Sequence, residues 1–319
     1  MSILSAELKP YKDVSGRLSA NEIISGYANA LFRDVTPPEQ LAGITLTEKL
    51  LYKIANDNET RGVNARFFIS DITPGGSRTV LYAGTQRNEV GDLTGSERKY
   101  GAGRLSADAI ASATSIIVDV ETGNSAESIY QVGDEIRIFD GTSKQFIILS
   151  SVSWAGDQAT LGLATPLDAG YLAATPTVIA SCIETAAIEC LTDNWVETST
   201  SGTYDEAGNP VVNDNLGGIE ETWTLTFTSA VDFTVIGDTV GNIGGGNISA
   251  NFTPVNPNFS KPYYSLLAAG FAGSWAINDT IVFQTHPAAQ PLFADLIINP
   301  GTTAYSNDNI KIKMYVESA

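Results

Sequence analysis

The sequence predicts an all-β fold: a β-sandwich with an inserted small β-barrel-like domain and an extended N-terminal arm. Residues 220–237 alternate strictly, with Trp223, Leu225 and Phe227 on one side and threonines on the other. This pattern is typical of a hairpin with one face in a core and the other in water or on a partner. The 29 glycines and 13 prolines fit many short strands joined by turns. No strong amphipathic pattern with a helical period runs for ten residues or more.

Strand and turn signals divide the chain into four parts. Residues 1–43 are broken by polar turns and by Pro37-Pro38, and we expect an irregular arm there. Residues 44–104 carry three strands and then a long loop from residue 86. Residues 105–183 form the inserted unit, with five regularly spaced strand signals at 116–118, 132–139, 146–149, 159–163 and 177–180. Residues 184–319 supply the second part of the sandwich.

Two segments in the last part have a composition that does not favour regular strands. Glycine-rich residues 241–246 follow the hairpin, and we expect a flexible loop there because glycine readily adopts positive φ. Residues 252–264 carry three prolines and four aromatic residues, and proline is confined to the edges of sheets. We therefore expect residues 252–264 to form an extended run on the surface.

The charge of the chain limits its partners. It has 18 basic and 36 acidic residues, a net charge of −18, and a pI near 4.3. Nucleic acid and anionic membranes repel such a surface, so we expect neither specific nucleic-acid binding nor membrane binding. Two interpretations of the acidity remain open: solubility at high concentration, or an acidic wall along which DNA passes without sticking.

The cysteines and the first residues indicate a reducing environment. Cys182 and Cys190 lie in apolar stretches outside any Cys-x-x-Cys motif, and we expect buried free thiols. The N-terminal residues show no apolar segment after a basic start, and no stretch reaches the roughly 18 apolar residues of a membrane span. We expect a protein that is made and used in a reducing interior, or that leaves it without the secretory route.

Residues for catalysis or metal binding are few. His286 is the single histidine, and with two separated cysteines it does not make a zinc site. The glycine pairs lack the residues of a phosphate-binding or dinucleotide-binding loop. Residues 205–206, 213–215 and 307–309 are rich in oxygen ligands but lack calcium-loop spacing, so calcium binding stays open. A pair of carboxylates for glycoside hydrolysis also stays open, because their separation is a three-dimensional property. We expect a non-enzymatic protein without cofactor or resident metal.

Candidate subunit contacts fall into three groups. Apolar side chains in the arm are too scattered to form a core of their own. Basic residues concentrate in the loop that ends at residue 104. Aromatic residues accompany the prolines of 252–264. The three groups are Ile23, Ile24, Tyr27, Leu31 and Phe32; Arg87, Arg98, Lys99 and Arg104; and Phe252, Tyr263 and Tyr264.

Several segments resemble virion structural proteins encoded by tailed bacteriophages and prophages. The resemblance is carried by residues 31–36, 94–103, 222–227 and 283–289 and by the last four residues, and it spans the chain from about residue 20 to its end. It departs at Leu296 to Gly301, which is less basic than in the proteins that the chain resembles. The resemblance implies a virion protein without catalytic residues and leaves its place in the particle open.

These observations together favour a structural protein that assembles in many copies with itself and with other virion proteins. We expect it in the virion, after assembly in the host cytoplasm, most plausibly as the tail tube subunit. Capsid decoration and baseplate proteins are alternatives within the class. A carbohydrate- or receptor-binding β module is the alternative from another class, since exposed aromatic residues on β-sandwiches stack on sugars.

Overall fold

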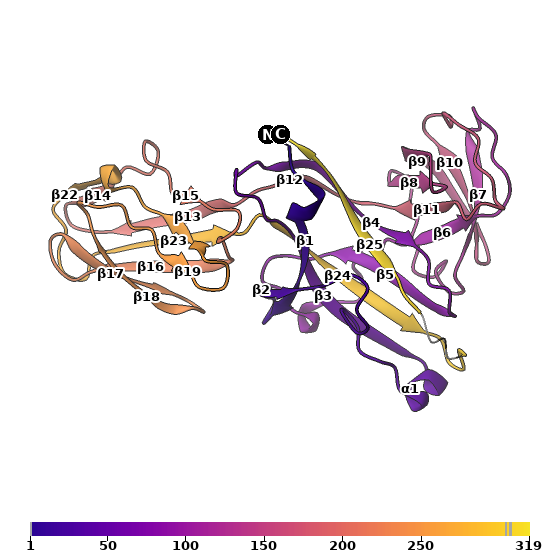
Figure 1. The fold of residues 1–319 in the computed structure, drawn as a ribbon, viewed down its shortest axis with the longest axis horizontal. Coiled ribbons are helices and arrows are strands. Elements are labelled where there is room, and N and C mark those ends of the chain that lie inside the picture. The colour runs from indigo at the N-terminus through magenta and orange to yellow at the C-terminus, as the bar shows by residue number, and fades with distance from the viewer. Residues whose placement is uncertain (1, 304, 306–307) are drawn as a thin grey trace.

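The computed structural model describes residues 2–303, 305 and 308–319 and shows three β lobes in a row (Figure 1). We name them the sandwich lobe in the middle, the barrel lobe (residues 102–181) and the distal lobe (residues 191–286). The prediction of an all-β fold with a small barrel is confirmed. Helices are short: α1 and three 3-10 turns, at Pro37–Ala42, Ser5–Glu7, Val90–Asp92 and Ala268–Gly270.

The sandwich lobe packs two sheets face to face around an apolar core that includes Leu50, Phe67 and Leu292. The first sheet has the order β2-β1-β3-β24-β5, with bounds Arg17–Glu22, Leu8–Val14, Ile44–Ile54, Ala289–Ile298 and Ser77–Ala83. The second has the order β12-β4-β25, with bounds Ile183–Ile188, Gly62–Asp71 and Lys311–Ser318. Both termini meet on this lobe, where the Ile3 amide donates to Ser318 Oγ at 2.7 Å (Figure 1).

The barrel lobe closes six strands into a ring, so that it has no free sheet edge. Their order is β10-β7-β6-β11-β8-β9, with bounds Gln158–Leu163, Ser115–Val120, Ala102–Leu105, Val178–Ser181, Glu135–Phe139 and Lys144–Ala155. All five expected strands are present. Ile136, Leu161 and other buried side chains fill the interior, and Val80 and Ile297 of the sandwich lobe pack against the same core.

The distal lobe is one five-stranded antiparallel sheet with loops packed on its inner face. Its order is β13-β23-β16-β17-β18, with bounds Leu191–Thr198, Thr280–His286, Glu221–Phe227, Asp232–Gly237 and Gly241–Asn247. Three short strand pairs stiffen the covering loops: β14–β22, β15–β21 and β19–β20, at Gly202–Tyr204 with Phe271–Gly273, Val212–Asn213 with Tyr264–Ser265, and Val255–Asn256 with Lys261–Pro262. As the alternation predicts, Trp223, Leu225 and Phe227 are fully buried.

Four expectations about local structure need correction. Residues 8–22 are not part of an irregular arm, because β1 pairs with β3 and β2 pairs with β1. Residues 184–319 do not all join the sandwich, because residues 191–286 form the separate distal sheet. The glycine run 241–246 lies in strand β18, not in a loop, and a Cβ at Gly245 would lie 2.4 Å from the Phe233 carbonyl oxygen. Residues 252–264 run over the distal lobe with exposed positions such as Val255, but Phe252, Tyr263 and Tyr264 turn inward and join its aromatic core.

Both outer lobes leave the sandwich lobe and return to it through neighbouring antiparallel strands. In the barrel lobe, β6 pairs with β11, with Gly103 opposite Ile179. In the distal lobe, β13 pairs with β23, with Leu191 opposite His286. Because the two ends of each lobe are adjacent, each can be inserted without disturbing the sandwich sheets.

We expect residues 101–182 to fold alone, because their ends are adjacent and their core is closed. The isolated segment should show a β-type circular dichroism spectrum and one cooperative thermal transition. Leu161→Ala, which truncates a fully buried core side chain, should lower its free energy of unfolding by about 2–5 kcal/mol. A segment without a cooperative transition would show that the barrel depends on the packing of Val80 and Ile297.

Candidate interaction surfaces and the junction between lobes

Two buried lysines on β3 face away from the sandwich core. Lys49 and Lys53 are 2% and 0% exposed, and they alternate with the core residues Leu50 and Tyr52. The Lys49 ammonium donates to the Gly16 carbonyl, and to those of Thr85 and Asn88 at 2.8 and 2.6 Å. It thereby joins the β1–β2 turn to the loop after β5.

Lys53 makes the corresponding link to the distal lobe. Its Nζ donates to the Leu216 carbonyl oxygen at 2.5 Å and lies 4.0 Å from the ring centroid of Phe259. Burial lowers the pKa of Lys53, like that of Lys49, to about 8. The cost of burying each ammonium is offset by carbonyl acceptors, which are held in place in return.

Two arginines of the sandwich lobe bind carboxylates of the distal lobe, of which Glu220 and Glu221 are buried and Asp238 is exposed. Arg87 Nε lies 2.5 Å from Glu220 Oε1, and Arg17 Nη2 lies 2.8 Å from Asp238 Oδ2. Arg17 Nη1 also lies 3.4 Å from Glu221 Oε2. Glu220 and Glu221 are 2% and 0% exposed. Removing one partner of such a pair leaves a buried charge without compensation, so these contacts strongly favour one arrangement of the two lobes.

The carboxyl groups in this network have shifted pKa values. Burial raises the pKa of Glu221 to about 7. The hydrogen bond from Arg17 holds the pKa of the neighbouring Asp238 well below its usual range. The two acidic groups share one guanidinium, and the more exposed Asp238 keeps its charge at lower pH.

Further polar contacts extend the junction beyond the ion pairs. The side chain of Asn215 donates through Nδ2 to Asn56 Oδ1 at 2.8 Å, and the backbone amide of Asn215 donates to Glu59 Oε2 at 2.5 Å. Lys261 Nζ lies 2.5 Å from Asp57 Oδ1 on the surface. Contacts from β2, β3 and two loops therefore hold the distal lobe at several points.

His286 belongs to the same network. Its Nδ1 lies 2.6 Å from Glu220 Oε2 and its Nε2 lies 3.0 Å from Asp193 Oδ1. The hydrogen bond to Glu220 raises the pKa of His286 to about 9, so the imidazole is charged at neutral pH. Because both ring nitrogens face carboxylates, the side chain is suited to an ion-pair role and is not arranged as a base beside a nucleophile.

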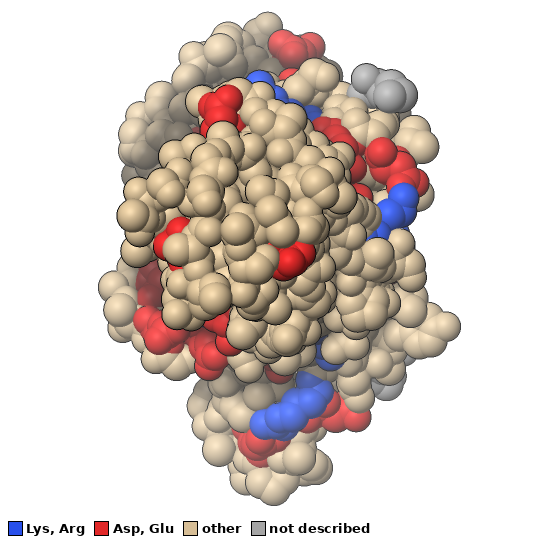
Figure 2. Space-filling model, turned by 90° about the vertical axis from the view of Figure 1, so that its left-hand side faces the viewer, with Lys and Arg blue, Asp and Glu red and all other residues tan. Residues whose placement is uncertain are grey.

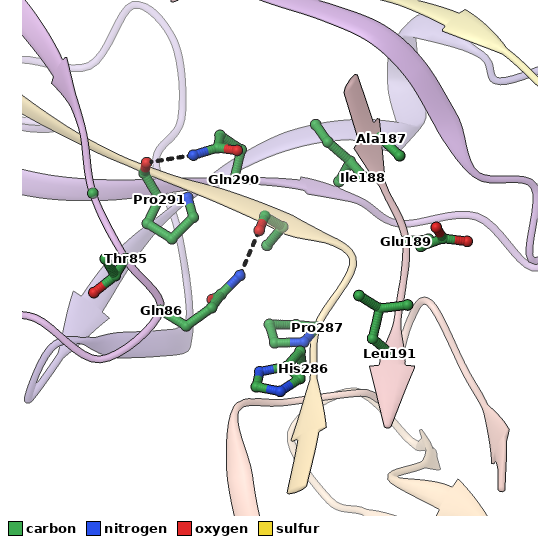
Figure 3. A pocket seen from close by; sticks show the side chains of 12 residues that line it. Thr85, Gln86, Ala187, Ile188, Glu189, Leu191, His286, Pro287, Gln290 and Pro291 are labelled. Carbon is green, nitrogen blue, oxygen red and sulfur yellow. Dashed lines mark hydrogen bonds between the residues drawn. The ribbon is translucent and has the colours of Figure 1, made fainter. Parts of the chain in front are cut away.

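A cavity of about 330 Å³ lies beside this junction (Figure 3). Its polar groups are largely engaged within the chain: Gln86 Nε2 donates to the Ala289 carbonyl at 2.6 Å, and Gln290 Nε2 to the Pro291 carbonyl at 3.0 Å. The lining comes from the segment after β5, from the end of β12 and the start of β13, and from the end of β23 and the start of β24. It consists of Gly84, Thr85, Gln86, Ala187, Ile188, Glu189, Leu191, His286, Pro287, Ala289, Gln290 and Pro291.

The predicted contact residues of the arm separate into two sets. Ile24 and Tyr27 are 55% and 70% exposed. Ile23, Leu31 and Phe32 pack against the core of their own sandwich lobe. Ile24 and Tyr27 are therefore open to solvent in this structure. Their contact with a neighbouring subunit stays a prediction.

The predicted basic group is largely engaged within the chain. Arg87 binds Glu220 at the junction, as described above. Arg98 pairs with Asp134 and donates to the Ser128 carbonyl at 3.0 Å, and Lys99 Nζ lies 2.8 Å from Glu127 Oε2. Arg98 and Lys99 thereby connect the loop before β6 to the barrel lobe. Arg104 is exposed on β6.

The predicted aromatic contacts are wrong. Phe252, Tyr263 and Tyr264 are 9%, 6% and 0% exposed, within the core of the distal lobe. Tyr264 packs edge-on to Phe283 with ring centroids 5.1 Å apart. The prolines place this segment over the sheet, where its aromatic rings fill the space that a second sheet would occupy.

The oxygen-rich loops close turns of the chain. Asp205 Oδ1 accepts from the Gly208 amide at 3.0 Å, and Asp214 Oδ1 from the Gly217 amide at 2.7 Å. Asn307 lies outside the described residues. Within the described ranges, no group of three or more His, Cys, Asp or Glu side chains is placed to hold a metal ion. Cys182 and Cys190 are free thiols, as expected. None of the helices described has the length and apolar character to span a bilayer.

The distal sheet presents an outer face to solvent. The sequence predicts this face only for the threonines of β16. Thr224 lies opposite Val282 and Ile236, and Thr226 lies opposite Thr280 and Thr234. Two rows of side chains thus cross the sheet, and no side chain in them can ionise. We define this outer face as Val196, Val282, Thr224, Ile236 and Asn242 in one row and Thr198, Thr280, Thr226, Thr234 and Gly245 in the other.

The uncharged surface continues beyond the sheet. From Thr239 to Asn278, Lys261 is the single charged residue. Figure 2 looks onto the end of the distal lobe and shows mostly uncharged side chains there, with separate acidic residues among them. On a chain with a net charge of −18, this is a distinct surface.

Comparisons with known proteins identify no family for this chain. No family model matches it, and no curated protein matches it. Among solved structures, it is similar to VP17, a capsid protein of bacteriophage P23-77, at 10% sequence identity and a TM-score of 0.18. That match covers 80% of this chain and 88% of VP17. A TM-score this low carries no argument about fold or function.

The ion pairs at the junction can be tested by removing both arginines. Arg17→Ala with Arg87→Ala should leave each lobe folded but loosen the distal lobe, because Glu221 loses Arg17 and Glu220 keeps only His286, a residue of its own lobe, as a charged partner. Small-angle X-ray scattering should show a broader distance distribution, and limited proteolysis should cut near residues 189 and 287. Arg33→Ala with Arg61→Ala, which removes two exposed ion pairs, is the matched control. Identical scattering from both double variants would contradict a locking role.

The single histidine allows a direct pH measurement. By proton NMR, the imidazole of His286 should titrate near pH 9, compared with 6.5 for a free side chain. Since the folded pKa is raised, its stabilising contribution is complete below pH 6.5 and is lost as the pH rises through 9. Glu220→Gln should move the midpoint down. A wild-type midpoint at or below 6.5 would contradict the two-carboxylate geometry.

Proposed function

We propose that this protein is a non-enzymatic structural component of the virion of a tailed phage, built into the particle in many copies. The observation that carries the proposal is the way the lobes are joined. Paired strands connect each outer lobe to the sandwich lobe, and buried ion pairs hold the distal lobe in a defined orientation. A repeated assembly requires subunits of one fixed shape, and this junction provides it.

The placement of the aromatic residues favours a structural role over sugar binding. Trp223 and Trp275 are 0% and 3% exposed in the distal core. Trp195 stacks on Phe283 with centroids 5.2 Å apart, and Trp154 stacks on Tyr130 at 6.0 Å. The tryptophan rings are thus used in packing, and the cavity at the junction has no aromatic lining among the described residues.

Within the virion, we place the protein in the tail tube, with capsid decoration and baseplate as the other positions. The net charge of −18 supports the tube, because DNA that passes through a channel must not adhere to its wall. This position requires that acidic residues line the inner wall. It also requires that Arg98 and Lys99, which are neutralised within the chain, lie away from it.

Electron microscopy of concentrated purified protein tests this proposal. We expect rings or short tubes with an enclosed channel in negative stain, and a matching fast-sedimenting species in analytical ultracentrifugation. Sheets or shell-like arrays without a channel would contradict the tube position and favour decoration. A monomer at the highest soluble concentration would contradict a self-assembling structural protein.

A further inference from the structure

The outer face of the distal sheet is free of packing within its own chain. Ile236, on the inner strand β17, and Val196, on the edge strand β13, are 50% and 55% exposed. Neither they nor Val282 belong to the apolar core of the lobe, which is on the opposite side of the sheet. A flat, β-branched and partly apolar sheet surface therefore faces outward.

The two rows carry no ionisable side chain although the chain is strongly acidic, and the same face carries Asp232 beyond one row and Asp193 beyond the other. Two copies of a chain with a net charge of −18 repel each other, and like charges opposed in a contact cost several kcal/mol. A contact between copies is thus favoured where acidic side chains are missing. The two rows meet this condition.

We propose that the outer face of the distal sheet binds the same face of a second copy of this chain. This inference rests on the proposed structural function and names one surface through which copies meet; because a two-fold contact closes on a pair, the contacts within a ring come from other surfaces. Facing sheets of threonine and valine side chains pack through their methyl groups, and a two-fold arrangement brings each row against its equivalent.

The size of the face predicts the strength of the contact. Five strands about 4.8 Å apart, with two rows about 6.6 Å apart along them, cover roughly 24 by 13 Å, or about 300 Å² per copy. Two copies together bury about 600 Å², which is below the usual size of specific interfaces. A single pair is therefore weak, and the contact becomes effective when other contacts in an assembly hold the copies close.

Charge substitutions on the face provide the test, with sedimentation velocity on the full chain as the measurement. Ile236→Glu and Val196→Glu should each weaken self-association at least about tenfold. Ile236→Lys should weaken self-association as well, even though the added lysine makes the net charge of the chain less negative. Ile148→Glu is the matched control, because Ile148 is 42% exposed on a barrel strand and lies outside the face. Thermal melting of each variant confirms that it is folded.

The outcomes separate this inference from the proposed function. Weakened association of the three face variants with an unchanged Ile148→Glu control supports the inference. Folded face variants that associate like the wild type overturn it and leave the structural role intact. A lysine variant that associates more strongly than the wild type would show an effect of net charge and also overturn the inference. A wild-type chain that never associates would overturn both.

Discussion

The arrangement of the lobes depends on strand β3, because both of its faces are buried by different parts of the chain. Leu50, Tyr52 and Ile54 face the sandwich core. On the other face, Lys49 holds the β1–β2 turn and the loop after β5, and Lys53 holds the loop of the distal lobe at Leu216. One strand thus joins the core of the sandwich to the orientation of the neighbouring lobe.

The polar character of this junction follows from its position. A purely apolar contact between lobes tolerates sliding, because hydrophobic attraction has no direction. Buried lysines and arginines act only toward acceptors at particular distances, and an arrangement that leaves them unpaired is costly. The network around Glu220, Glu221 and His286 therefore favours one geometry. In a subunit that repeats in an assembly, this precision has more value than additional stability.

Local patterns in the sequence were sufficient to predict most strands. They did not predict which distant segments of the chain pack against one another. The alternation of Trp223 to Phe227 predicts their buried face correctly, and the regular spacing predicts five barrel strands. The sixth, β6, is four residues long and follows a loop without periodicity, so it gave no signal of its own. Gly245 and Gly246 are in a strand because β18 pairs with β17, and Phe233 leaves no room for a side chain at either position, which is a tertiary constraint. The burial of Lys49, Lys53 and Tyr264 likewise results from segments that are distant in the sequence.

In our proposal, the two uncharged rows on the outer face of the distal sheet connect the fold to assembly. The most direct test is a cryo-electron microscopy reconstruction of the assembled protein, which shows which surfaces of adjacent copies meet. Our account predicts that Thr224, Thr226 and Ile236 are buried against the same residues of a second copy, with the junction at Arg17 and Arg87 unchanged. A reconstruction in which this face is open to solvent and copies meet through other surfaces would contradict it.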